Sequence, residues 1–172
     1  MFDEELQALA AMVVRDFATN KMKIATVESC TGGLIGGCIT SAAGSSDVFD
    51  RGFLTYSNSA KTELVNVDPE IIQKFGAVSA ECASSMAIGG LQTADVDACV
   101  AVTGIAGPGG GSKEKPIGLV FVAVAVASEE GAFVERFEFG DIGRDAVRIA
   151  TVREALEMLL GYAIEGDEAP EL

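Results

Sequence analysis

The sequence predicts one three-layer α/β/α domain with a mixed, largely parallel sheet. Three observations lead to this fold class. Segments with helical periodicity alternate with short apolar, β-branched segments, which is typical of α/β proteins. Two of the apolar segments flank a turn at Glu129-Glu130-Gly131, so we expect them to pair as an antiparallel hairpin. The length of 172 residues suits a single domain that buries a proper core.

The elements of the first half follow from periodicity and from capping residues. Apolar side chains at three- and four-residue steps predict helices, and short β-branched or aromatic runs predict strands. A Ser or Asn ahead of a helical segment satisfies its first amides, which makes Ser57 or Asn58 a helix start. In chain order we expect a helix over 2–20, a strand over 24–27, a helix from Leu34 to about Ala42, a loop over 43–46, a strand over 49–56 and a short helix that carries Lys61.

The second half continues the alternation. Asp68-Pro69 is a capping residue followed by proline at the first helical position, which predicts a helix start. The segment 117–127 is apolar without interruption, so we place it at the centre of the sheet. In chain order we expect a short helix after Asp68, a longer one opened by Ser79, strands over 96–102, 117–127 and 133–139, the last nearer an edge, and a final helix from about Arg144.

The charge balance argues against nucleic acid as a partner. The chain has 26 acidic and 12 basic residues and a net charge of −14, whereas phosphate-backbone binding needs clustered Lys and Arg. Part of the acidity lies in 165–172, which we expect to be a frayed tail beyond a single domain over 1–164. A small anionic substrate stays possible, because one Arg and a helix N-terminus act locally.

The same composition predicts a soluble, cytoplasmic protein without membrane contact. No apolar run reaches the roughly 20 residues that span a bilayer, and the start of the chain is too acidic for a signal peptide. The four cysteines at 30, 38, 82 and 99 form no C-x-x-C pair and have no histidine partner. They predict reduced, mostly buried thiols and no metal site.

The most informative segment is Glu28 to Gly33, which follows the first predicted strand and precedes a helix. Such a turn sets Ser29 and Thr31 at a helix N-terminus, where free amides and the dipole favour negative charge. Ser29 there either attacks a carbonyl or caps the helix. The chain has no histidine, so the base for a nucleophilic serine must be Lys, Asp, Glu or Tyr. A helix N-terminus also lowers a thiol's pKa, but no histidine is present to pair with Cys30.

A second glycine-rich segment, Thr103 to Gly111, also follows a predicted strand. In open α/β sheets ligands bind beyond the carboxyl ends of strands, so both loops can face one crevice. Neither loop matches the dinucleotide or P-loop pattern, and each taken alone is equally compatible with a tight turn.

Lys61, Tyr56 and the arginines of the last helix are the remaining candidates. A desolvated lysine amine can act as general base, and Ser–Lys pairs are a known variant of the serine nucleophile. Taken alone, Lys61 fits a surface lysine, Tyr56 a half-buried strand aromatic, and Arg144 and Arg148 a solvated helix face.

Taken together, five motifs in order make the sequence specific. They are TVESCTGG from Thr26 to Gly33, RGFLTYSN from Arg51 to Asn58 with Lys61 after it, GAVS from Gly76, TGIAGP from Thr103 and KPIG from Lys115. This combination resembles the CinA C-terminal domain family and its stand-alone nicotinamide-nucleotide amidases, from about Glu5 to Leu160.

The resemblance implies a deamidase of nicotinamide mononucleotide in pyridine nucleotide salvage, which releases ammonia and yields nicotinate mononucleotide. It implies Ser29 as nucleophile, Lys61 as base and Tyr56 as an assisting residue, with no cofactor and no metal. We expect a small-molecule nucleotide substrate and a homo-oligomer, with a dimer favoured. We also expect the amides beside Ser29 and the 104–107 loop to hold the oxyanion. The substrate-binding candidates are Thr31, Gly32, Gly33, Thr103, Gly104, Ala106, Gly107, Arg144 and Arg148.

Two departures from the family pattern limit this inference. Larger members carry an N-terminal domain that resembles molybdopterin-binding proteins, and activities tied to it do not transfer to this chain. The stretch Gly140 to Arg144 is two residues longer than the family's Gly-Asp-Arg, so either Arg144 or Arg148 can be the phosphate ligand. We favour Arg144, because it aligns with the arginine of that pattern. An inactive ligand- or partner-binding module of the same fold stays open, and phosphoryl transfer ranks last because a P-loop lysine is missing.

Overall fold

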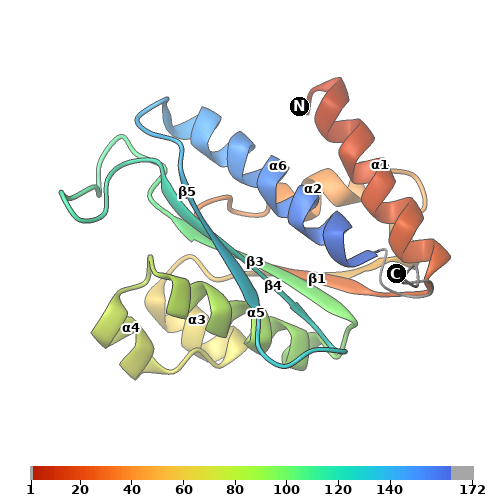
Figure 1. Cartoon of the computed structure of the whole chain (residues 1–172), viewed down its shortest axis with the longest axis horizontal. Coiled ribbons are helices and arrows are strands. Elements are labelled where there is room, and N and C mark those ends of the chain that lie inside the picture. Colours follow the sequence, from red (N-terminus) through yellow and green to blue (C-terminus); the bar gives the residue numbers. More distant parts are fainter. Residues whose placement is uncertain (1, 164–172) are drawn as a thin grey trace, which may run out of the picture.

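The computed structural model describes residues 2–163, which form an α/β domain of three layers. Figure 1 shows a twisted sheet with α1, α2 and α6 on one side and α3, α4 and α5 on the other. In chain order the elements are α1 (Glu4–Thr19), β1 (Ile24–Glu28), α2 (Leu34–Thr40), the 3₁₀ helix η1 (Ser45–Asp47), β2 (Phe49–Leu54), α3 (Asn58–Val65), α4 (Pro69–Phe75), α5 (Ala80–Ala94), β3 (Ala98–Gly104), β4 (Leu119–Val126), β5 (Phe133–Glu138) and α6 (Arg144–Ala163).

The predicted α/β class with a mixed sheet is confirmed. The strand order is β2-β1-β3-β4-β5, with β1 parallel to both β2 and β3. β4 is antiparallel to β3 and to β5, so the expected hairpin is present and parallel pairing is confined to β2, β1 and β3. The apolar β4 is an interior strand, although β3 rather than β4 is central, and the alternating β5 lies at an edge as predicted.

Element boundaries differ from the prediction by a few residues, for local reasons. The expected loop over 43–46 contains the start of η1. β2 ends at Leu54 because the chain then turns into α3, where Ser57 rather than Asn58 is the cap and accepts a hydrogen bond from the Ala60 amide. β4 begins at Leu119 because its amide closes a turn onto the Pro116 carbonyl.

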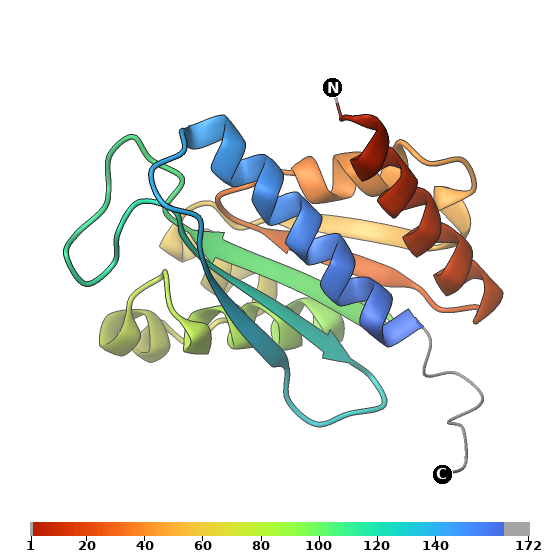
Figure 2. The same cartoon turned by 45° about the horizontal axis from the view of Figure 1, so that its top comes forward.

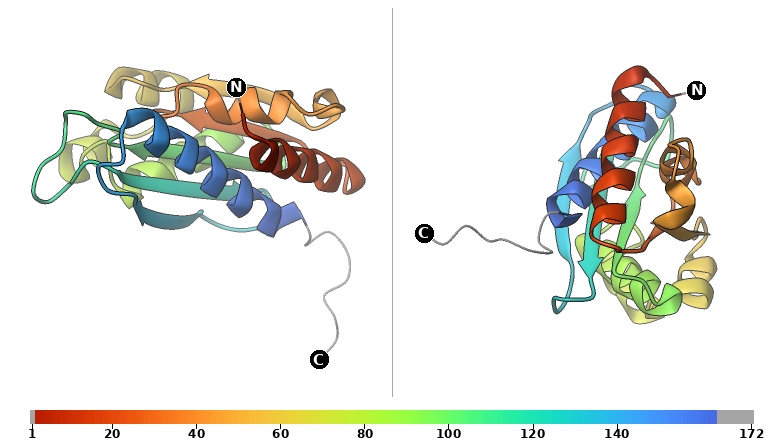
Figure 3. Two further views of the ribbon diagram at one scale, coloured as in Figure 1. Left: turned by 90° about the horizontal axis from the view of Figure 1, so that it is seen from above. Right: turned by 90° about the vertical axis from the view of Figure 1, so that its right-hand side faces the viewer.

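The core lies on both faces of the sheet. One apolar cluster joins α1, α2 and α6 to the sheet, and a second joins α5, with parts of α3 and α4, to the opposite face. α1 packs against α6 and α2, and Figure 3 shows α1 and α6 side by side. Coverage on both faces explains why β1, β3 and β4 are buried along almost their whole length. All four cysteines are buried free thiols, as predicted.

The sheet topology brings the candidate loops to the same end of the parallel strands. β2, β1 and β3 run parallel, so Leu54, Glu28 and Gly104 end at the same side of the sheet. The loop after β3 and the first turn of α6 lie at this end as well (Figure 2). The acidic tail expected over 165–172 lies outside the described residues. Within residues 2–163, no helix is both long enough and apolar enough to cross a membrane.

Candidate functional site

A cavity of about 200 Å³ lies at the carboxyl end of the parallel strands. It is formed by the segments that follow β1, β2 and β3, together with α3, the connection between α4 and α5, and the start of α6. The residues that line it are Ser29, Cys30, Tyr56, Asn58, Lys61, Ala77, Val78, Thr103, Gly104, Ala106 and Arg144.

Ser29 is the first residue after β1 and faces this cavity. Its amide donates to the Val102 carbonyl at 3.2 Å, which extends the pairing of β1 with β3 by one residue. The side chain does not cap α2, whose N-cap is Gly33 without a side-chain hydrogen bond. The Ser29 hydroxyl instead accepts a hydrogen bond of 3.2 Å from Nζ of Lys61. Of the two roles open to this serine, helix cap or reactive hydroxyl, the geometry therefore favours the second.

Lys61 is a buried lysine rather than a surface one. Only 1% of the residue is exposed, and its Nζ donates a second hydrogen bond of 2.7 Å to the Thr55 carbonyl. Among the ion pairs of the described chain, none involves Lys61. Burial lowers the pKa of the Lys61 amine from its ordinary value of 10.5. A lysine in this state loses its proton more easily and can serve as a general base.

Arg144 and Tyr56 lie together at the mouth of the cavity. Nη1 of Arg144 donates to the Gly107 carbonyl at 2.8 Å, and Nη2 donates to Oη of Tyr56 at 3.1 Å. Tyr56 is 64% exposed, so its ring forms part of the rim rather than the core. The half-buried position expected for this tyrosine is therefore not observed.

Thr103 and Gly104 form the wall contributed by β3. Thr103 is buried, and its hydroxyl donates to the Ala77 carbonyl at 2.8 Å, which fixes the connection between α4 and α5 against the sheet. A Cβ atom on Gly104 would lie 2.6 Å from a methyl carbon of Val120 and 2.9 Å from the Leu119 carbonyl oxygen. Only glycine fits at this close approach of two strands.

The helix N-terminus beside Ser29 is filled by the chain itself. The buried carboxylate of Glu28 accepts hydrogen bonds from the amides of Gly33, Ile35 and Gly36 at 2.9, 3.1 and 2.8 Å. It also accepts one of 2.6 Å from the Thr31 hydroxyl. These groups were expected to face a substrate or an oxyanion, and the structure corrects that expectation. Thr31, Gly32 and Gly33 do not line the cavity.

Arg148 also lies away from the cavity lining. Its Nε and Nη2 donate to the carbonyls of Cys30 and Thr31 at 3.2 and 3.0 Å, and Nη1 lies 3.7 Å from Asp145. The two arginines, of which Arg144 was favoured as the phosphate ligand, are thus in different places. Arg144 is at the mouth of the cavity and Arg148 is over the back of the Ser29 turn. Gly107 contacts Arg144 through its carbonyl but does not line the cavity.

Three contributions to the site were missed at the sequence level. The first is Glu28: an acidic residue at the end of an apolar strand, followed by Ser, Thr and Gly, signals a buried carboxylate with local donors. Asn58 was considered only as a helix cap, and it lines the cavity. Ala77 and Val78 carry no chemical signal of their own, and only the fold brings them there.

The cysteine next to Ser29 is not activated. Burial raises the pKa of the Cys30 thiol to about 11, which outweighs the nearby cations Lys61 and Arg148. The lowered pKa that a helix N-terminus would have produced is therefore not found. The thiol stays protonated near neutral pH and is a poor competitor for the nucleophile role.

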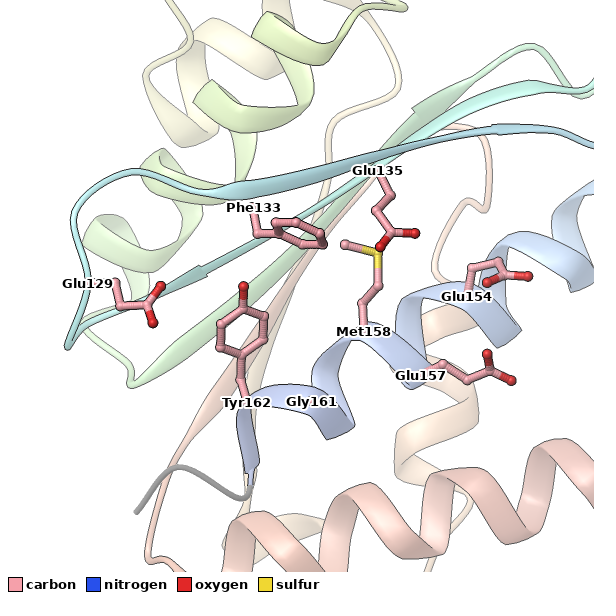
Figure 4. A pocket seen from close by; sticks show the side chains of 8 residues that line it. All are labelled: Glu129, Phe133, Glu135, Glu154, Glu157, Met158, Gly161 and Tyr162. Atoms are coloured by element: carbon pink, nitrogen blue, oxygen red, sulfur yellow. The ribbon is translucent and has the colours of Figure 1, made fainter. Parts of the chain in front are cut away.

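A larger hollow of about 480 Å³ lies elsewhere, between β5 and α6. Figure 4 shows its glutamates, Glu129, Glu135, Glu154 and Glu157, around Phe133, Met158 and Tyr162. Burial, and to a smaller extent the neighbouring carboxylates of Glu157 and Glu135, raises the pKa of Glu154. This hollow holds neither a nucleophile nor a cation, so it suits an anionic substrate poorly. Within the described chain, no group of three or more His, Cys, Asp or Glu side chains is arranged to hold a metal ion.

The chain is similar to several known proteins. The sequence model of the CinA C-terminal domain matches residues 6–163. The nicotinamide-nucleotide amidohydrolase PncC of Escherichia coli K12 is 45% identical over 159 residues, which are 92% of this chain and 95% of that protein. The putative competence-damage inducible protein of Acetivibrio thermocellus is 45% identical over 163 residues, which are 95% of this chain but 38% of that protein. The chain thus spans about two fifths of the length of such longer relatives.

Solved structures agree in fold. The competence/damage inducible protein CihA from Agrobacterium tumefaciens superposes with a TM-score of 0.91 at 48% identity, over 94% of this chain and 97% of that chain. A CinA superfamily protein from Escherichia coli has a TM-score of 0.86 at 27% identity, over 94% of each chain.

Proposed function

The chain belongs to the CinA C-terminal domain family, and on this premise we propose that it is a nicotinamide-nucleotide amidohydrolase. It hydrolyses the carboxamide of nicotinamide mononucleotide to a carboxylate and releases ammonia. The similarity to Escherichia coli PncC, which covers nearly the full length of both chains, supports this activity class.

The observation that carries the proposal is the 3.2 Å contact between Nζ of Lys61 and Oγ of Ser29, inside a cavity and with both residues buried. A serine needs a base within hydrogen-bond reach, and the chain has no histidine to supply one. Burial lowers the pKa of Lys61, which favours the neutral amine that a base requires.

The reaction follows from this pair. Neutral Lys61 accepts the hydroxyl proton as Oγ of Ser29 attacks the carboxamide carbon. Lys61 then gives the proton to the leaving nitrogen, ammonia departs, and an ester remains on Ser29. Lys61 next deprotonates a water molecule, which attacks the ester. The carboxylate product leaves, and the serine hydroxyl regains its proton.

The oxyanion of the tetrahedral intermediate needs donors close to Ser29. The amides of Ser29 and Gly32 donate within the chain, and those of Gly33, Ile35 and Gly36 donate to Glu28. Among the hydrogen bonds of residues 2–163, the amides of Cys30 and Thr31 donate to no other residue. Of these two, the Cys30 amide is the candidate oxyanion donor. It directly follows the nucleophile and lines the cavity, so we assign it as an oxyanion donor.

The nucleotide part of the substrate lies at the mouth. Pockets that enclose drug-sized ligands measure about 300–1,000 Å³, whereas this cavity measures about 200 Å³. It therefore takes the carboxamide and its ring and leaves the ribose phosphate outside. The guanidinium of Arg144 is placed there and binds the phosphate by charge-assisted hydrogen bonds.

The second candidate is a binding module that keeps the fold without turnover. The intact Ser29–Lys61 contact disfavours it, because a module has no need of a buried lysine with a lowered pKa. The deciding experiment incubates the purified protein with nicotinamide mononucleotide and measures ammonia together with the carboxylate product. Ammonia released in the same amount as the carboxylate product supports the enzyme. Thermal stabilisation by the nucleotide without ammonia supports the module.

A further inference from the structure

The turn that carries Ser29 is held from two sides by charged side chains. Its amide side faces Glu28, whose carboxylate accepts the four hydrogen bonds from Thr31, Gly33, Ile35 and Gly36. Its carbonyl side faces α6, from which Arg148 donates to the carbonyls of Cys30 and Thr31. The charges are opposite, and each faces the backbone groups of complementary polarity.

The turn needs such support because its two glycines allow its backbone to adopt other conformations. Gly32 and Gly33 both have positive φ, at 61° and 98°, a region that glycine enters freely and leaves as freely. Ser29 lies three residues before this pair, and its hydroxyl must stay within reach of Lys61, which belongs to α3. A displacement of about 1 Å in a reacting group can cost on the order of 100-fold in rate.

We propose that Arg148 is a positioning residue for the nucleophile, acting with Glu28 to hold the Ser29 turn against Lys61. The inference rests on the proposed function and assigns Arg148 to turnover rather than to phosphate binding. Its guanidinium is already used, since Nε and Nη2 bind carbonyls and Nη1 faces Asp145. It also lies against the turn itself, 3.6 Å from where a Cβ on Gly32 would be. A phosphate at the cavity mouth therefore meets Arg144, not Arg148.

Lysine cannot replace arginine in this role. Two carbonyls are bound by two nitrogens of one planar group, and an ammonium is a single compact charge on a flexible stem. Arg148→Lys keeps the positive charge but removes the planar guanidinium group that binds both carbonyls. The side chain of Arg148 is 26% exposed, so we expect the replacement to disturb the packing less than a substitution in the core would.

The test uses the purified full chain and two readouts. The first is steady-state kinetics with nicotinamide mononucleotide, which gives kcat, the pH midpoint of kcat and KM. The second is the rate at which a small fluorophosphonate labels Ser29, followed by mass spectrometry, which reports the nucleophile without any nucleotide. Arg153→Lys is the matched control, since Arg153 lies on the same helix and pairs with Glu5 at 3.1 Å on the surface.

We expect Arg148→Lys to lower both kcat and the labelling rate about 10- to 100-fold, with KM changed less than about twofold and the pH midpoint unmoved. Arg153→Lys should match the wild type in all four. Thr31→Val, which removes a hydrogen bond to Glu28 from the other side of the turn, should lower the labelling rate in the same direction. It supplies the test if Arg148→Lys does not fold.

Other outcomes overturn the inference. An unchanged labelling rate in Arg148→Lys shows that the turn holds its position unaided. A raised KM for the nucleotide alone, with normal labelling, makes Arg148 a phosphate ligand. If wild-type Ser29 is labelled but no ammonia is released, the proposed function is wrong, while the labelling rates still decide the role of Arg148. If wild-type Ser29 is not labelled, both proposals are wrong.

Discussion

Arg144 donates a hydrogen bond of 3.1 Å from Nη2 to Oη of Tyr56, although 88 residues separate the two in sequence. The other contact of its guanidinium is also to a neutral oxygen, the Gly107 carbonyl. Among the ion pairs within residues 2–163, none uses Arg144. A cation held in place by neutral acceptors keeps its full charge for an incoming anion, even in a chain of net charge −14.

Removal of this cation should weaken binding of the phosphate. Hydrogen bonds to charged groups contribute about 1.5–3 kcal/mol, so Arg144→Ala should raise KM for nicotinamide mononucleotide roughly 10- to 100-fold. KM for nicotinamide riboside, which lacks the phosphate, should change little. Arg136→Ala, a surface arginine of β5 paired with Glu138, is the control. Equal losses for both substrates would show that Arg144 does not bind the phosphate.

Substitution of the nucleophile should separate activity from stability. Ser29→Ala removes a hydroxyl that caps no helix, so the melting temperature should stay close to that of the wild type. Ammonia release should fall by orders of magnitude. Ser41→Ala, an exposed serine that bonds the Cys38 carbonyl, controls for the loss of a local hydroxyl. Near-full activity in Ser29→Ala would transfer the nucleophile role to another residue, with Cys30→Ala as the next variant.

The pH dependence of kcat should report Lys61. Only the neutral amine accepts a proton, so activity should rise with pH through the Lys61 ionisation and level off above it. Since burial lowers this pKa from 10.5, the midpoint should lie below that value. Lys61→Arg keeps a positive charge but yields no neutral base, and it should be nearly as inactive as Lys61→Ala. Substantial activity of the arginine variant would mean that Lys61 supplies charge alone.

The ionisation of Lys61 should also make the free energy of unfolding depend on pH. The folded chain has a lowered Lys61 pKa, whereas the unfolded chain titrates near 10.4. Between the folded-state and unfolded-state pKa values the unfolded chain binds more protons, so the free energy of unfolding increases as the pH rises. Urea unfolding should show the difference between wild type and Lys61→Met shifting in favour of the wild type across this alkaline window, and staying flat below it. A shift in the opposite direction would contradict a lowered pKa.

Lys115 should support the cavity from outside. Its Nζ donates to the carbonyls of Phe75 and Val78 at 2.6 and 2.7 Å, which ties the glycine-rich loop to the segment that carries Val78. We expect Lys115→Met to lower the free energy of unfolding by about 1–3 kcal/mol and to raise KM. Lys113→Met, two residues away on the exposed part of the loop, should do neither. Equal behaviour of the two variants in urea titrations and in kinetics would show that the hydrogen bonds of Lys115 do not support the cavity.

Sequence reasoning predicted the order and type of the helices and strands because capping residues and periodicity act locally. Ser57, Asp68 and Ser79 each cap the helix that they were expected to start. The pairing of Ser29 with Lys61 was expected from the resemblance to the CinA C-terminal domain family, and the structure places the two side chains in contact. The expected dimer stays a prediction, for which light scattering is the measurement.

The remaining parts of the site depend on three-dimensional arrangement. Sequence places Arg144 and Arg148 on one face of a helix, but only the crossing of α6 over the sheet sets one at the mouth and the other behind the Ser29 turn. In the same way, the pattern predicted a helix N-terminus beside Ser29 but not that the Glu28 carboxylate binds its amides. Glu28 reaches those amides because it is the last residue of β1, directly before the turn, and no local propensity encodes that reach.

The placement of α6 gives the site an order of assembly. Ser29 and Lys61 both belong to the first 61 residues, while Arg144 and Arg148 come from the last helix of the described chain. During synthesis, the nucleophile and its base therefore leave the ribosome long before the carbonyl side of their turn has a partner. If the proposed function holds, reactivity should begin only when α6 docks, so that an unfinished chain does not attack other amides and esters.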